Sequence, residues 1–356
     1  MICPHCERNL LRKERPRNTC SHCGREYALD PKTNPLGLSD LRVRRVLAKI
    51  TEEGRIAVAP DQLWFALART RIKERKFAPG CAGSSLFAGL VVGFFGLSTH
   101  IGALLVISAV LLLTSVAFAC ARAAGAGRGI PAMSRAAFRS QVLGPWRTVY
   151  GALPLEVIED SAPPRVRTGS RPSSEDGAGA GAVLLCPDSS IRAFLTANGL
   201  PARYGITLAE HLDAVHALPA RGPVIVLRDA DAHGELLIRQ VRETLGQRPV
   251  IDAGVPLRAA RALARPVPYR DRADRPGRET MARLTALGEF TEEELKWLGR
   301  GWRVALVGIP PARLLATVGR VAERAARGTG PGQHRAAAVG FMTWPAPAHQ
   351  NPEGDR

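Results

Sequence analysis

Residues 223–254 read PVIVLRDADAHGELLIRQVRETLGQRPVIDAG, with two short apolar runs on either side of an amphipathic pattern. The runs PVIVLRD and PVIDAG are typical of buried strands, whereas HGELLIRQVRETLG has the apolar spacing of a helix. Strand, helix and strand in this order, joined by short turns, predict two parallel strands connected by a crossover helix.

The same alternation continues on both sides and predicts a mainly parallel sheet with helices on both faces, a Rossmann-like α/β domain over residues 182–327. Strands are expected at 182–186, 203–207, 223–229, 249–254 and 303–309, and helices at 189–199, 208–218, 233–246, 256–264, 291–301 and 310–328. Residues 122–181 are expected to be a basic segment that ends in a flexible linker. The Pro/Gly-rich residues 328–356 are expected to be a disordered tail.

Acidic residues follow two of the expected strands. Asp229 and Asp231 come directly after the apolar run PVIVL, Gly234 opens the next helix, and Asp188 follows the first strand. The pattern DADAHGELLI resembles the second motif of the Toprim fold of topoisomerases and primases. In that family an Asp-x-Asp pair at a strand end binds magnesium beside a glutamate from the end of the first strand.

The resemblance implies a Toprim-like domain with a possible magnesium site at Asp229 and Asp231, and it makes Asp188 the third catalytic candidate. The sequence departs from the family where the glutamate is expected, because Cys186 and Pro187 stand there. A purely structural interpretation competes with this one: Asp231 would cap the following helix and Asp229 would hold the turn.

The first 30 residues contain two C-x-x-C pairs, Cys3 with Cys6 and Cys20 with Cys23, separated by thirteen residues. Each pair can form a tight turn that directs two thiolates at one ion, and two such turns complete a closed tetrahedral site for structural zinc. The segment resembles a zinc ribbon. It is too short for an apolar core of its own, so metal binding is expected to supply most of its folding free energy.

Between the ribbon and residue 121 the sequence predicts a helical module at 37–77 and a pair of transmembrane helices. Residues 81–121 lack Asp, Glu, Lys and Arg, and this run is about twice the length of one membrane span. The polar residues at 98–100 divide it, which gives expected spans at 81–97 and 101–121. Basic residues precede the first span and follow the second, and the loop between the spans carries no charge. The positive-inside rule therefore predicts a protein of the cytoplasmic membrane, in contact with lipid, with both termini in the cytoplasm.

Composition adds little about activity. The formal charge of +17 favours anionic partners, but Lys and Arg are dispersed along the chain. No dinucleotide fingerprint, phosphate-binding loop or nucleophile elbow is present.

These features together predict a multi-domain membrane protein that acts as a binding, scaffold or regulatory module without catalysis. Its unidentified protein or nucleic-acid partner would bind the ribbon or the α/β domain. One alternative is a membrane-tethered, metal-dependent phosphodiester enzyme of the Toprim kind. The other is a regulatory domain that binds a nucleotide at the same strand ends.

Overall fold

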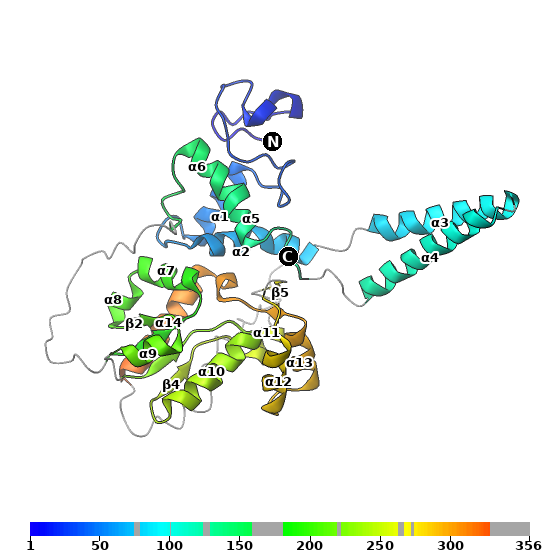
Figure 1. Cartoon of the computed structure of the whole chain (residues 1–356). Helices are drawn as coiled ribbons and strands as arrows, with labels where there is room; N and C mark the ends of the chain where they lie inside the picture. The colour runs from blue at the N-terminus through cyan, green and yellow to red at the C-terminus, as the bar shows by residue number, and fades with distance from the viewer. Residues whose placement is uncertain are drawn as a thin grey trace, which may run out of the picture.

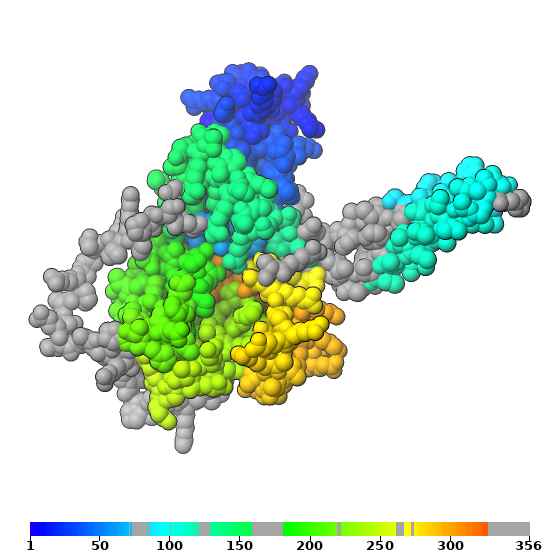
Figure 2. All heavy atoms as spheres, in the orientation of Figure 1, coloured from blue at the N-terminus to red at the C-terminus, as the bar shows by residue number. Residues whose placement is uncertain are grey.

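The computed structural model describes residues 1–74, 79–99, 101–123, 129–158, 181–218, 222–262, 267–271 and 274–327. The predicted tail at 328–356 and nearly all of the predicted linker lie outside the described residues. In Figure 1 the N-terminal ribbon stands above a group of helices, and these helices lie above the α/β domain. Figure 2 shows the same order as continuous surfaces of blue, green and yellow atoms.

Four short parallel strands form the main sheet, in the order β2-β1-β3-β4. Their bounds are Val183–Leu185 for β1, Thr207–Ala209 for β2, Val224–Val226 for β3 and Val250–Asp252 for β4. The register places Val183 opposite Thr207 on one side and Val224 on the other. The predicted parallel sheet is therefore confirmed.

Successive side chains of β1 and β3 point to opposite faces of the sheet, because a β-strand is pleated. Leu184 and Ile225 belong to the core that contains Phe194 of α7 (Ser189–Ala197) and Val318 of α14 (Pro311–Arg327). Their neighbours Val183 and Val224 pack with Val215 of α9 (Leu212–Ala217) and Ile238 of α10 (Ala232–Leu245). Helices cover both faces, and the central strands are buried on both.

Two expected strands differ from the structure. Residues 200–204 form a short helix, α8 (Leu200–Tyr204), and only the following residues join the sheet as β2. Residues 304–307 and Ile309 are apolar and buried, but they do not pair with a strand of the main sheet. Only Trp302–Arg303 is a strand (β6), antiparallel to β5 (Tyr269–Arg270), and a 3-10 turn η4 (Leu306–Gly308) follows.

The remaining helices of this half are α11 (Leu257–Ala262), α12 (Arg278–Ala286) and α13 (Glu292–Gly299). Helix α12 was not among the expected elements, because Leu284 is its single buried residue and its apolar pattern is weak. Thr291 caps α13 in a capping box with Glu294, the arrangement that the pattern TEEE indicates.

The helical group comprises α1 (Asp40–Ile50), α2 (Pro60–Glu74), α5 (Arg135–Phe138), the π-helical turn η3 (Arg139–Leu143) and α6 (Gly144–Tyr150). The 3-10 turns η1 (Arg12–Glu14) and η2 (Pro16–Asn18) belong to the ribbon.

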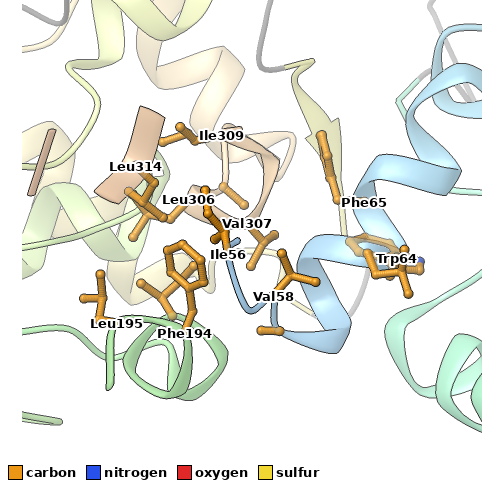
Figure 3. Close-up of a cluster of buried hydrophobic side chains, with 14 of the residues drawn as sticks. Ile56, Val58, Trp64, Phe65, Phe194, Leu195, Leu306, Val307, Ile309 and Leu314 are labelled. Carbon is orange, nitrogen blue, oxygen red and sulfur yellow. The ribbon is translucent and has the colours of Figure 1, made fainter. Parts of the chain in front are cut away.

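One apolar core joins the helical group to the α/β domain. Figure 3 shows Val58 and Trp64 from the N-terminal half beside Phe194, Leu306 and Val307 from the C-terminal half. All five are buried. Two hydrogen bonds pair the Asn198 amide with the backbone of Ala57, which fixes the two halves in register.

Two long helices, α3 (Pro79–Thr99) and α4 (Gly102–Ala123), form an antiparallel hairpin. They lie side by side in Figure 1, away from the ribbon. Glycines of α3 let the helices approach closely, and the Ser108 hydroxyl donates a hydrogen bond of 2.7 Å to the carbonyl oxygen of Gly89. Most large apolar side chains on the outer surface of the hairpin are exposed, among them Phe87, Phe94 and Leu113.

The predicted transmembrane hairpin requires a correction. Among the described residues, no helix combines the length and the apolar character that a membrane crossing needs. The prediction relied on the lack of charge over 81–121, yet nearly half of these residues are Gly, Ala, Ser or Thr, which are much less apolar than leucine. The membrane fold class, the two predicted spans and the cytoplasmic-membrane location are therefore not supported.

Candidate metal centre and strand-end charge network

The four N-terminal cysteines converge on one point. Their Sγ atoms all lie within 4.8 Å of one another, and the Cys3–Cys23 and Cys6–Cys20 pairs are 3.9 and 3.8 Å apart. A tetrahedral ion with metal–sulfur bonds of about 2.3 Å requires sulfurs about 3.8 Å apart, whereas a disulfide requires about 2.0 Å. The quartet therefore has the geometry of a site for one metal ion.

Backbone hydrogen bonds build the two knuckles in the same way. The amide of Cys3 donates to the carbonyl oxygen of Arg8 at 2.9 Å, and that of Cys20 donates to Arg25 at 3.0 Å. The turns close at Glu7 and Gly24, which share a left-handed backbone with φ of +59° and +67°. Two equivalent turns thus place the four thiols around one centre.

The histidines of the ribbon have other partners. The His5 ring nitrogen Nε2 lies 2.8 Å from the carbonyl oxygen of Glu26, which ties the first knuckle to the second. The His22 Nδ1 lies 3.2 Å from the guanidinium of Arg8. Backbone amides of Cys23 and His22 lower the pKa of Cys20 to about 7, the direction that favours a thiolate ligand.

A buried carboxylate attaches the ribbon to the helices below it. Asp40, in the first turn of α1, accepts hydrogen bonds from the backbone amides of Ala28 and Leu29 at 2.9 and 2.8 Å and from the hydroxyl of Tyr150. Within the ribbon itself, a buried ion pair joins Arg15 to Asp30. The metal centre is consequently held in a fixed position on the body of the protein.

At the carboxyl end of β3, the two aspartates singled out in the sequence lie together, and an arginine pairs with both. Asp231 caps α10 by accepting a 2.7 Å hydrogen bond from the amide of Gly234. The Arg303 guanidinium contacts the Asp231 carboxylate and lies 3.4 Å from that of Asp229. The other oxygen of Asp229 accepts a 2.9 Å hydrogen bond from the amide of Leu306.

Asp188 lies at the end of the neighbouring strand and caps α7 through the amide of Ile191. Its second oxygen is 3.7 Å from Arg135, whose guanidinium also contacts Asp61 at 3.3 Å and the Tyr269 hydroxyl at 2.9 Å. Each of the three aspartates at the strand ends thus has both a backbone partner and an arginine partner.

Burial dominates the electrostatics of Asp229. Removal from water, and then the negative charges of Asp231 and Asp188, raise the pKa of the Asp229 carboxyl to about 7, although Arg303 opposes the shift. The group is therefore partly protonated at neutral pH.

The crevice between β1 and β3 is the topological switch point of the sheet, where ligands of such folds bind. Here a segment of the chain itself lies against it. Val304 exchanges two backbone hydrogen bonds with Ala230, of 3.0 and 3.1 Å, and the buried Leu306 and Val307 follow.

Sequence reasoning found the cysteines and the aspartates but missed the residues that pair with them. Arg303 and Arg135 are ordinary charged residues in sequence, and they lie far along the chain from Asp231 and Asp188. Within the described residues, the cysteine quartet is the single cluster with the spacing of a metal site, and the predicted magnesium site at Asp229 and Asp231 stays a prediction.

No protein-family model, curated protein or solved structure matches this chain. The zinc-ribbon and Toprim-like resemblances therefore rest on the residues quoted for them.

Proposed function

We propose that this protein is a non-catalytic binding protein, and that its zinc-stabilised ribbon, residues 1–30, recognises a partner from a fixed position on the α/β domain. The set of four converging cysteine sulfurs is the observation that carries the proposal. A tetrahedral site with four thiolates leaves no coordination position for a substrate, so its role is to stabilise a surface.

Zinc is the ion that we assign to Cys3, Cys6, Cys20 and Cys23. Paired C-x-x-C turns with four thiolates are characteristic of structural zinc, and the sulfur spacing suits a single ion. Bound zinc would stabilise the ribbon, whose own buried cluster consists of Leu10 and the cysteines.

The strand ends also support a role without catalysis. A metal-dependent phosphodiester enzyme needs carboxylates that are free to coordinate magnesium. Asp229 and Asp231 instead both pair with Arg303, and Asp188 is engaged in a helix cap. Nucleotide binding is disfavoured in a similar way, because Leu306 and its neighbours lie at the switch point.

The zinc assignment is tested on the purified full chain by elemental analysis and thermal unfolding. We expect about one zinc per chain, and we expect Cys20→Ser to lose the metal and to unfold at a lower temperature. Cys120→Ser is the matched control, because Cys120 is an exposed free thiol of α4 and lies outside the quartet. A metal-free chain with an intact ribbon would contradict the assignment.

The absence of catalysis is tested by titrating the zinc-loaded chain with manganese and magnesium, followed by calorimetry. We expect no saturable binding that depends on Asp229 and Asp231. Saturable binding that the Asp229→Asn/Asp231→Asn double variant abolishes would instead favour the phosphodiester enzyme, and a nuclease assay of both chains would follow.

A further inference from the structure

The first knuckle of the ribbon carries two large exposed aliphatic side chains. Ile2 is 50 % exposed and Leu11 is 58 % exposed, whereas Leu10, Tyr27 and Leu29 of the same small ribbon are buried. The backbone explains why both lie on the outside. Ile2 pairs with Asn9 in an antiparallel bridge, while Met1 and Leu10 exchange hydrogen bonds beside it.

Side chains alternate across such a pair, so Cys3 and Leu10 face the metal centre while Ile2, Asn9 and Leu11 share the opposite face. Burial agrees with this assignment, because Cys3 and Leu10 are almost completely buried. Arg12 and Lys13 follow Leu11 directly and are exposed. We call these five residues, Ile2, Asn9, Leu11, Arg12 and Lys13, the outer knuckle face.

Arg12 and Lys13 place positive charge on this face next to Leu11. In the part of the chain that the structure describes, neither of these two side chains forms an ion pair. The Glu14 carboxylate accepts a hydrogen bond of 2.9 Å from the amide of Leu11 and offsets one of these two charges. The outer knuckle face therefore combines the exposed aliphatic side chains of Ile2 and Leu11 with a net positive charge beside Leu11.

We infer that the outer knuckle face binds an acidic segment of a protein partner that carries aliphatic side chains. The partner's aliphatic groups would cover Ile2 and Leu11, and its carboxylates would pair with Arg12 and Lys13. This inference deepens the proposed function and rests on it, because the metal-stabilised ribbon holds the face in shape. Asp40 keeps the ribbon immobile on the helices, which reduces the entropy lost on binding.

The residue types favour a protein over a single-stranded nucleic acid. Proteins that bind single strands stack bases on exposed aromatic side chains. Tyr27, the one Phe, Trp or Tyr residue of the ribbon, is completely buried. Contacts to phosphate alone would use Arg12 and Lys13 but would not require Ile2 and Leu11 to be exposed.

The test measures binding of two labelled probes to the zinc-loaded full chain by fluorescence anisotropy. One probe is an acidic peptide with leucines at alternate positions, and the other is an oligouridine. A peptide in which serines replace the leucines measures attraction by charge alone. We expect the acidic leucine peptide to bind most tightly, and both Ile2→Ser/Leu11→Ser and Arg12→Gln/Lys13→Gln to weaken it at least ~10-fold, since each variant removes contacts of that order.

Control variants outside the ribbon distinguish an effect on the outer knuckle face from a general effect of the substitution. Leu155 is fully exposed and Arg300 is an exposed cation outside the ribbon, so Leu155→Ser and Arg300→Gln should leave binding unchanged. Equal binding of the leucine and serine peptides would overturn the inference, as would oligouridine binding that only the charge variant abolishes. Zinc content is measured on the same samples. An unsubstituted chain that holds no zinc would indicate failure of the proposed function, whereas an unsubstituted chain that holds zinc but does not bind the acidic leucine peptide would overturn the assignment of this face alone.

Discussion

Glu7 and Gly24 occupy equivalent positions in the two knuckles, yet only one of them is glycine. Both have a left-handed backbone, which costs a residue with a side chain about 1 kcal/mol and costs glycine almost nothing. We expect Glu7→Gly to stabilise the folded ribbon by about 1 kcal/mol and to tighten zinc binding about fivefold in competition with a chelator. Gly24→Ala is the opposite change and should weaken zinc binding. If both variants shifted the zinc affinity in the same direction, the two positions would not be equivalent.

Asp229, whose side chain is 12 % exposed, predicts a pH-dependent stability. Its pKa in the folded chain, about 7, lies above the ordinary value near 3.9, so folding favours the protonated form. Its contribution to stability is complete below about pH 4 and is lost as the pH rises through 7, at no more than about 1.4 kcal/mol per pH unit.

Asp229→Asn should remove this dependence, because an amide imitates the protonated acid and still accepts the hydrogen bond from Leu306. Urea unfolding midpoints of both chains between pH 5 and 8 measure the effect. We expect the midpoint of Asp229→Asn to exceed that of the unsubstituted chain by more at pH 8 than at pH 5. A difference that does not vary with pH would show that the carboxyl titrates elsewhere.

Single residues also show where sequence reasoning reaches its limit. The cysteine quartet could be predicted because a metal site of this kind is built from two local turns whose spacing is visible in the chain. Asp231 could be predicted as a helix cap for the same reason, since its partner Gly234 is three residues away. Arg303 could not, because its contact with Asp231 depends on the packing of the whole α/β domain.

Among the secondary-structure elements, the hairpin was located correctly from the sequence but was wrongly assigned to a membrane. The expected segments 81–97 and 101–121 correspond to α3 and α4, because the polar residues at 98–100 interrupt the apolar run. Residues 303–309 show the opposite error: their apolar pattern is real, but they pack against strand ends and α2 instead of joining the sheet. A short buried run does not reveal whether its backbone partners are a strand or a turn.

The close contact between α3 and α4 gives a prediction about how these two helices pack. A Cβ atom at Gly93 would lie 2.7 Å from the Ser108 hydroxyl, the group that donates to Gly89. Gly93→Val should therefore separate α3 from α4 at a cost of about 1–3 kcal/mol, typical of overpacking. Faster hydrogen exchange in both helices would show that they have separated. Gly102→Ala is the control, because a Cβ atom added at Gly102 would have no neighbouring atom within 4 Å.

At the scale of the whole molecule, the apolar core does not stop at the expected start of the α/β domain at residue 182. Phe194, Leu306 and Val307 pack with Val58 and Trp64, so residues from both ends of the chain complete one core (Figure 3). The sequence suggests separate modules, because the spacing of apolar residues predicts each helix or strand individually and does not show which elements pack together. Which apolar faces are shared between modules is determined only by their packing.

A core shared in this way predicts that the helical group and the α/β domain unfold together. Val58→Ala removes buried methyl groups and should destabilise the chain by about 2–3 kcal/mol. Hydrogen exchange should then accelerate in α10 as well as in α2, although α10 lies on the other face of the sheet. An isolated fragment of residues 181–327 would expose Phe194 and Leu306 to water, so we expect it to aggregate or to melt well below the full chain. Two separate calorimetric transitions together with a stably folded fragment would contradict the shared core, and the N-terminal half would then be an appendage with its own stability.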